Sequence, residues 1–230
     1  MRFLAALIAL LILPWLPARA LESAAQESPR ARVTLVADHS AIAPGQAFQL
    51  GLRLRLAPRW HSYWRHAGDA GAPTEISLTL PEGSAASHIA WPIPQSIPFG
   101  PLVSFGYDGE VVLPVRTTPP AGLRVGEVFS IAAQATWLVC DDVCIPEEGS
   151  FHLDLPVAAE ALANPALAPL FASTAAALPR PSPWQASATI QGDALRLRLT
   201  GPGLGRESLK EALFIPGQGG LLDHPAPQSL

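Results

Sequence analysis

Hydrophobic and polar residues alternate along several segments of the chain, and the longest regular segment spans residues 48–56. Five large apolar residues alternate there with polar residues or glycine. A period of two over this length predicts a β-strand with one face in a core and the other in solvent. Other segments predict further strands at residues 32–37, 60–66, 76–80, 87–91, 111–115, 128–139 and 151–155.

Turn-forming residues separate these predicted strands. Pro44-Gly45 and Pro81-Glu82-Gly83 are typical of turns, and Asp108-Gly109 favours a hairpin turn because Asp-Gly tolerates positive φ angles. Residues 92–106 hold four prolines and two phenylalanines, which predicts a loop. About eight short strands with regular turns and no helix among them predict an all-β fold, an antiparallel β-sandwich of immunoglobulin-like type.

The composition changes after Pro156. Residues 157–183 are rich in alanine and proline, and we predict a linker with one helix, Pro165–Ala177, capped by Asn164. Residues 184–190 and 194–200 predict a hairpin, and residues 212–215 predict a third short strand. Three strands cannot close a sandwich, so we expect residues 184–230 to be the incomplete beginning of a second β domain.

Residues 1–20 have the three parts of a secretory signal peptide. Arg2 supplies the positive start, residues 3–13 are uniformly apolar, and Ala18-Arg19-Ala20 is a small-x-small cleavage site. Cleavage removes two arginines, which changes the formal net charge from −4 to −6. We therefore expect an exported chain whose first domain is residues 21–156.

Composition also limits the partners. No later apolar run approaches the roughly 20 residues of a membrane helix, so no membrane insertion is expected after signal cleavage. The mature chain is acidic and has no clusters of Lys and Arg, which argues against nucleic acid or anionic lipid as a partner. Motifs of hydrolases and nucleotide-binding proteins are missing, so these classes have no support.

The two cysteines, Cys140 and Cys144, are separated by three residues at the end of a predicted strand. In an oxidising compartment such a pair tends to form a disulfide. The short connection can bring the two Cα atoms within the roughly 4.4–6.8 Å that a disulfide needs. A closed loop of five residues stabilises a fold by only about 2 kcal/mol. We therefore favour a redox-active disulfide over a purely structural one.

Two alternatives remain open for the cysteine pair. One is an exported, non-enzymatic binding domain with a structural disulfide, and the other is a copper-binding protein. Structural zinc sites use four ligands, and His61 and His66 are five residues apart, which places them on opposite faces of a strand. Copper(I) favours thioether ligands, but the single methionine is Met1. We therefore expect neither a metal nor a cofactor.

Acidic residues surround the pair, with Asp141 and Asp142 between the cysteines and Glu147 and Glu148 just after them. Nearby negative charge disfavours a thiolate and raises the pKa of a thiol. The reduced cysteines are therefore expected to react slowly until a docked partner activates them. Such behaviour suits an electron relay better than a broad oxidase.

Two phenylalanines in the proline-rich loop, Phe99 and Phe105, are candidates for a cap over the cysteines. The alternative is that both side chains fill the end of the sandwich. Tyr63 lies in an aromatic segment, residues 60–66, for which core or rim packing is the simplest interpretation.

The segment Trp137–Gly149 (WLVCDDVCIPEEG) resembles the active-site segment of the periplasmic N-terminal region of DsbD-type thiol:disulfide interchange proteins. It is most similar to the ScsB branch, which is associated with suppression of copper sensitivity. The resemblance covers residues 30–155, and residues 184–230 resemble the start of the second N-terminal β domain of that branch. Further matching segments follow in the same order: Trp60–Arg65, Gly68-Asp69, Trp91-Pro92, Phe99–Leu102, Phe105–Tyr107 and Gly109-Glu110.

The resemblance implies a protein-disulfide reductase component of the Gram-negative periplasm. Cys140 and Cys144 would be the catalytic pair, which receives electrons from a thioredoxin-like donor domain and reduces periplasmic partners such as disulfide isomerases. The membrane domain and the thioredoxin-like domain of the family are not in these 230 residues, so activity would depend on them being supplied.

The resemblance also implies roles around the pair. In DsbD a loop phenylalanine caps the cysteines when no partner is bound, and Phe99 or Phe105 would take that part here. Tyr63, Asp141 and Asp142 are the further candidates for capping or for partner docking.

Overall fold

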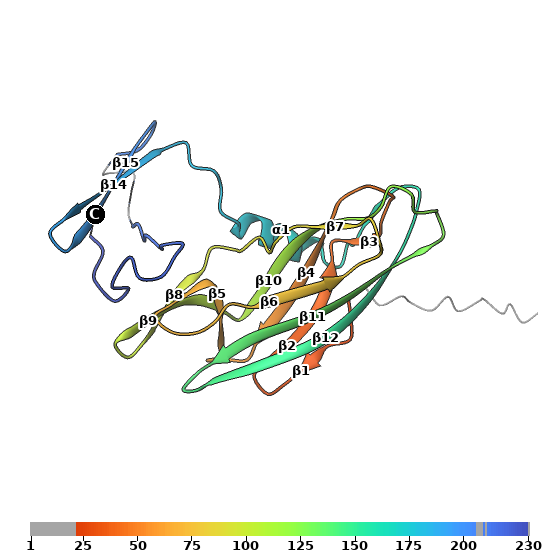
Figure 1. Ribbon diagram of the computed structural model, residues 1–230, viewed down its shortest axis with the longest axis horizontal. Coiled ribbons are helices and arrows are strands. Elements are labelled where there is room, and N and C mark those ends of the chain that lie inside the picture. The colour runs from red at the N-terminus through yellow and green to blue at the C-terminus, as the bar shows by residue number, and fades with distance from the viewer. Residues whose placement is uncertain (1–21, 206–208, 210, 230) are drawn as a thin grey trace, which may run out of the picture.

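The computed structural model describes residues 22–205, 209 and 211–229 (Figure 1). The predicted signal peptide, residues 1–20, lies outside the described residues. The elements are β1 (Gln26–Glu27), β2 (Ala31–Ala37), β3 (His39–Ala41), β4 (Phe48–Leu56), β5 (His61–Gly68), β6 (Glu75–Thr79), β7 (Ala85–Ala86), β8 (Gln95–Phe99), β9 (Leu102–Asp108), β10 (Glu110–Thr118), β11 (Val128–Cys140), β12 (Cys144–Pro156), β13 (Leu162–Ala163), α1 (Ala168–Ala177), β14 (Gln185–Gln191) and β15 (Ala194–Thr200).

Two antiparallel sheets form a β-sandwich, which confirms the predicted fold class. One sheet has the strand order β1-β2-β4-β10-β7, and the other has the order β12-β11-β5-β9-β8, with β6 paired to β11. Figure 1 shows the long β11–β12 hairpin running along one side of the sandwich. The alternation of β4 places its apolar residues in the core, where they meet the inward residues of β11 and β12.

The helix begins later than the sequence predicts. It spans Ala168–Ala177, and residues 165–167 form a turn in which the Asn164 side chain accepts a hydrogen bond from the Ala166 N–H (3.2 Å). Pro169 lies in the first turn of the helix, where proline is tolerated because the N–H it lacks would have no partner. Phe171 of the helix packs with Val36 and Val112 on the outer side of the five-stranded sheet.

Three other predictions differ from the structure. The proline-rich loop 92–106 contains a hairpin, β8–β9, whose two-residue turn at Gly100 and Pro101 is allowed by the positive φ of Gly100 (58°). Residues 87–91 are not a strand, although the N–H groups of Ser87 and Ala90 donate to carbonyls of β10; the short strand β7 lies just before them. The expected strand 212–215 is irregular.

Residues 184–200 form the predicted hairpin, β14–β15, with seven registered pairs. Figure 1 shows this hairpin apart from the sandwich, joined to it by the segment that follows α1. All residues of both strands are exposed. Within the described ranges, the structure has no helix long and apolar enough to cross a membrane.

Candidate functional site

The two cysteines form a disulfide that closes the β11–β12 hairpin. Cys140 is the last residue of β11 and Cys144 the first of β12, and the two are direct partners in the strand register. Their Cα atoms are 4.2 Å apart. The connecting residues form a tight turn in which the N–H of Asp141 donates to the carbonyl of Val143 (3.3 Å).

The disulfide lies on the outer face of its sheet. Odd-numbered residues of β11 such as Trp137 and Val139 enter the core, so Cys140 belongs to the alternate, outward row. Cys140 is nevertheless only 1% exposed, whereas Cys144 is exposed to solvent. The two cysteines therefore differ in burial, although they share one bond.

Tyr63 of β5 covers Cys140 and contacts Cys144. Its hydroxyl lies 3.4 Å from the Cys144 sulfur, and its ring packs in a small cluster with Cys140, Ala67 and Leu138. A disulfide sulfur carries no proton, so the tyrosine hydroxyl is the donor in this contact. Burial raises the pKa of Tyr63, which keeps the hydroxyl protonated at neutral pH.

The loop between β5 and β6 lies over the Tyr63 ring. A β-carbon added at Gly71 would lie 2.2 Å from Cε1 of Tyr63, and Gly71 has a φ of 110°, which disfavours other residues. Glycine at this position therefore allows the loop to approach the tyrosine closely. The same loop is held by Ser104, whose hydroxyl donates to the carbonyl of Ala70 (3.0 Å).

His61 lies beside the buried cysteine. It is the direct register partner of Cys140, and its ring makes an edge contact with Tyr63, with centroids 5.3 Å apart. Burial lowers the pKa of His61, although the charges of Asp141 and Asp108 act in the opposite direction. The side chain is therefore a neutral imidazole at pH 7, on the strand position directly beside the buried Cys140.

An arginine faces the two aspartates of the turn. Nη2 of Arg59 lies 3.3 Å from Asp141 and 3.7 Å from Asp142. The guanidinium is largely exposed, so these pairs are weak. They still offset part of the negative charge that the sequence places beside the thiols.

The two glutamates do not stand together at the cysteines. Glu147 faces the core side, where it accepts hydrogen bonds from the Arg30 guanidinium (2.7 Å) and the Trp137 indole (3.0 Å). Glu148 shares the outward face with Cys144 but is four residues further along β12, roughly 13 Å away. Of the four acids, the two aspartates alone flank the disulfide directly, which corrects the expectation that all four act on it.

The two candidate cap residues have different environments. Phe105 is 3% exposed and belongs to the core cluster, where it contacts the ring of His66. This position favours the alternative in which Phe105 fills the end of the sandwich. Phe99 is 51% exposed and ends β8 at the tip of the β8–β9 hairpin. Phe99 is thus the accessible member of the two.

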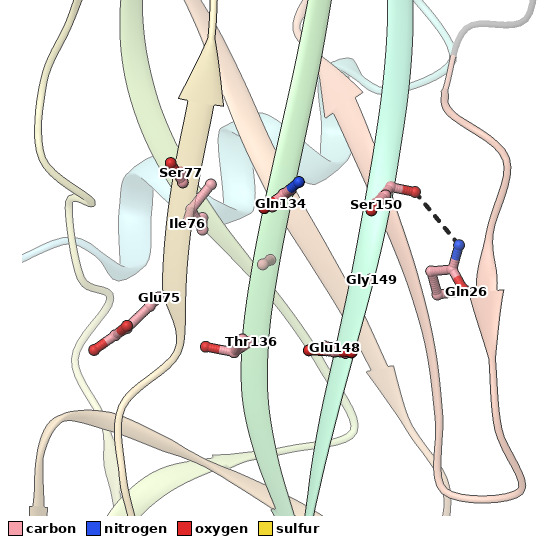
Figure 2. Close-up of a pocket in the computed structure, with 10 residues that line it drawn as sticks. Gln26, Glu75, Ile76, Ser77, Gln134, Thr136, Glu148, Gly149 and Ser150 are labelled. Carbon is pink, nitrogen blue, oxygen red and sulfur yellow. Dashed lines mark hydrogen bonds between the residues drawn. The ribbon is translucent and has the colours of Figure 1, made fainter.

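A groove of about 610 Å³ runs along the outer face of β6, β11 and β12 (Figure 2). Glu75, Thr136 and Glu148 form one row across its three strands, and Ser77, Gln134 and Ser150 form the next. Its lining contains neither a cysteine nor a histidine, so the disulfide lies outside it. The groove offers hydrogen-bonding groups on the cysteine face, but it does not hold the redox chemistry.

Residues outside the predicted set complete the site. Three residues that the sequence did not mark lie at the disulfide: Arg59, Gly71, and His61 in its role as the neighbour of Cys140. They come from separate segments, and strand register and loop position bring them together. The glycine-rich segment after β5 is the one sequence signal that marks a close approach of backbone. Across the described part of the chain, no group of three or more His, Cys, Asp and Glu side chains is arranged to hold a metal ion.

Comparison with known proteins gives one family and a small set of similar structures. Residues 32–156 match the family model described as thiol:disulfide interchange protein DsbD, N-terminal. The N-terminal periplasmic domain of ScsB from Proteus mirabilis is similar in structure, with a TM-score of 0.59 and 24% identity over 78% of this chain and 68% of that chain. The reduced N-terminal domain of DsbD from Neisseria meningitidis aligns with a TM-score of 0.26 and 17% identity, over 53% of this chain and 86% of that one. No curated protein matches the chain.

Proposed function

Because the chain belongs to the family of DsbD N-terminal domains, which take part in thiol-disulfide exchange, we propose that it relays electrons through the Cys140–Cys144 pair. In this proposal the oxidised pair accepts two electrons from a thioredoxin-like donor dithiol. The reduced pair then passes them to disulfide-bearing partners. The observation that carries the proposal is the unequal burial of the two bonded cysteines, one exposed residue and one buried residue.

The exposed sulfur is the site of attack. A donor thiolate attacks Sγ of Cys144, the S–S bond breaks, and Cys140 leaves as a thiolate that takes up a proton. The donor's second thiolate then attacks the sulfur of the donor's first cysteine in the mixed disulfide, and Cys144 leaves as a thiolate. The donor ends as a disulfide and this chain as a dithiol. The reverse sequence, started by the Cys144 thiolate, reduces a partner.

Two side chains are positioned to assist these steps. The Tyr63 hydroxyl, 3.4 Å from Sγ of Cys144, donates to that sulfur as it acquires negative charge. A hydrogen bond to the charged form lowers the pKa of a thiol. The neutral imidazole of His61, beside Cys140, is placed to take or return the proton of that thiol.

The proposal also assigns a role to each segment of the chain, a compartment and partners. Residues 1–20 act as the signal peptide, residues 21–156 as the redox domain, residues 157–183 as a linker and residues 184–230 as the beginning of a second β domain. The chain acts in the periplasm, and disulfide isomerases are among its acceptors. Tyr63, Asp141 and Asp142 lie at the pair and act as docking or capping residues. Phe99, at the tip of the β8–β9 hairpin, is the exposed candidate cap from the proline-rich segment.

The test compares two single-cysteine variants, Cys140→Ser and Cys144→Ser. Each purified variant is mixed with a thioredoxin whose resolving cysteine is replaced and whose remaining cysteine is activated as a mixed disulfide with thionitrobenzoate. Release of thionitrobenzoate reports the formation of the protein–protein disulfide. Because Cys144 is exposed and Cys140 buried, we expect Cys140→Ser to react at least about tenfold faster than Cys144→Ser.

Equal rates, or a faster reaction of Cys144→Ser, would contradict the assignment of Cys144 as the attacked sulfur. Failure of both variants to react, with both folded by circular dichroism, would contradict the relay itself. The Asp142→Asn variant in the Cys140→Ser background is the matched control for charge. Its rate should rise only severalfold, because Asp142 is exposed and Arg59 already faces it.

A further inference from the structure

A pair of histidines joins the C-terminal segment to the sandwich. His66 lies near the end of β5, and His224 lies in the irregular segment 211–229, which returns to β5 and β9 (Figure 1). The Nε2 atoms of the two rings face one another at 3.4 Å. The His224 side chain is only 5% exposed and lies against the ring of Phe105, with centroids 5.2 Å apart.

A carboxylate fixes the orientation of His224. Oδ1 of Asp69 lies 2.7 Å from Nδ1 of His224, and Oδ2 of Asp69 accepts a hydrogen bond from the Val103 N–H at 2.8 Å. The neutral His224 therefore carries its proton on Nδ1 and points the lone pair of Nε2 toward His66. This carboxylate–histidine arrangement is the one that supports histidine ligands in metal sites.

The separation of the two nitrogens fits a shared ion better than a shared proton. Good N–H hydrogen bonds have donor–acceptor distances of about 2.7–3.2 Å. An ion that holds two imidazole nitrogens at about 2.0–2.1 Å in tetrahedral geometry separates them by roughly 3.3–3.4 Å. The observed 3.4 Å matches the second case.

The C-terminal segment approaches the His66 ring closely. Gly219 passes close to this ring, and a β-carbon there would lie 3.3 Å from Cε1 of His66. Its missing side chain allows the C-terminal segment to reach the ring. His66 contacts Phe105 of the core cluster, whereas His61 contacts Tyr63 on the outer face of the sheet, so the pair is separate from the disulfide.

We propose that His66 and His224 bind one divalent transition-metal ion of the zinc type, with Asp69 as the residue that positions His224. The two imidazoles are the protein ligands, and water fills the remaining coordination positions. Binding requires no net loss of a proton, because His66 needs only to move its proton from Nε2 to Nδ1. The ion links β5 directly to the C-terminal segment, so it should stabilise that contact.

The test is metal titration of the purified protein without an affinity tag and with the disulfide intact, so that thiols do not compete. Zn²⁺ binding is followed by calorimetry, and Co²⁺ binding by visible absorption. We expect one equivalent to bind, with an affinity reduced more than about tenfold in His66→Gln and in His224→Gln. Asp69→Asn should reduce it by about 10- to 100-fold, as is typical of residues that orient a ligand. His88→Gln, at an exposed histidine, is the matched control.

Absence of saturable binding in the parent protein would overturn the proposal, as would unchanged affinity in both ligand variants. Loss of binding in His88→Gln would also overturn it, because this residue lies elsewhere. Circular dichroism of each variant shows whether the fold is kept. If a variant is unfolded, the test uses the visible spectrum of Co²⁺ bound to the parent protein. Ligation by nitrogen changes the absorption of Co²⁺, whereas adsorption to the protein surface does not. Disulfide exchange uses other residues, so either result leaves the relay proposal to its own test.

Discussion

Two hairpins of this chain have the same alternating pattern but very different surroundings. In β11–β12 the inward residues Phe129, Ile131 and Trp137 are buried between the two sheets. In β14–β15 the apolar residues also share one face, because Ile190 pairs with Leu195 and Ala188 with Leu197. No second sheet of the described residues covers that face, and the exposed fractions of its large apolar residues run from 36% at Leu199 to 80% at Ile190.

The difference shows that alternation sets pairing but not burial. Both hairpins satisfy their backbone hydrogen bonds, but only the first has a second sheet to cover its apolar side. The covered hairpin can hold a disulfide in a defined environment, with Tyr63 and His61 fixed beside it. The exposed hairpin is expected to contribute little to the stability of the sandwich.

The largest expected effect comes from truncating the packed hairpin. Phe129→Ala removes a fully buried ring and should lower the free energy of unfolding by about 3–5 kcal/mol. Leu197→Ala, the matched change in the exposed hairpin, should alter it by less than about 0.5 kcal/mol. Urea unfolding followed by tryptophan fluorescence measures both. Similar losses for the two variants would mean that the hairpins are equally packed.

A second comparison uses two glycines with positive φ, one near each hairpin. Gly71→Ala adds a β-carbon against the Tyr63 ring, whereas Gly192→Ala, in the turn of β14–β15, meets open space. Gly192→Ala strains only the left-handed backbone of a hairpin that contributes little to the sandwich, so its cost should stay below about 1 kcal/mol, and Gly71→Ala should lose about 1–3 kcal/mol more. Thermal unfolding of the two variants should rank them in this order. A Gly71→Ala protein no less stable than Gly192→Ala would show that the loop does not need its close approach.

A smaller change isolates the Tyr63 hydroxyl. Tyr63→Phe keeps the ring over Cys140 but removes the donor to Cys144, a bond worth about 1.5 kcal/mol when its acceptor is charged. The pKa of the Cys144 thiol in the reduced protein should rise by about one unit. Its alkylation rate as a function of pH, measured in the Cys140→Ser background, gives this pKa. If the pH dependence of alkylation is unchanged, the Tyr63 hydroxyl has no part in the mechanism. If the free energy of unfolding of Tyr63→Phe equals that of the parent, the change in thiol pKa does not come from altered packing.

The smallest effect is a pH dependence of stability. Burial lowers the pKa of His61 below its ordinary value of 6.5, while Asp141 and Asp108 partly oppose this and Arg59 pairs with Asp141. The unfolded chain therefore binds the proton first, so His61 lowers stability as the pH falls below about 6.5. Urea unfolding at pH 7.5 and pH 5.5 should show a smaller loss for His61→Gln than for the parent. A loss of the same size would assign the pH dependence to other groups.

Much of the fold can be predicted from the alternation. The strands β2, β4, β5, β6 and β11 lie within one or two residues of their predicted positions, and β10 extends three residues beyond its predicted end. The alternation is clearest in β4 and β11, where the apolar positions face the core. The β8–β9 hairpin could not be predicted in this way. Its prolines suggest a loop, and only pairing with β5 keeps β9 in the sheet.

The candidate site shows a similar limit. The cysteine spacing predicts a closed pair, and the structure has this disulfide. The sequence does not tell which sulfur is accessible, because Cys140 is buried by Tyr63 from a strand some eighty residues away. It also places Glu147 beside the thiols, whereas strand alternation and Arg30 hold it on the other face. Long-range register decides both points.

The reduction potential of the Cys140–Cys144 pair tests the central claim most directly. The purified protein is equilibrated with glutathione and then thioredoxin buffers, and unfolding is followed in both redox states. A relay predicts a potential in the range of exchange proteins, about −120 to −270 mV, and a loss of no more than about 2 kcal/mol on reduction. A potential below about −300 mV, together with melting of the sandwich on reduction, would contradict the relay and make the disulfide a structural bridge.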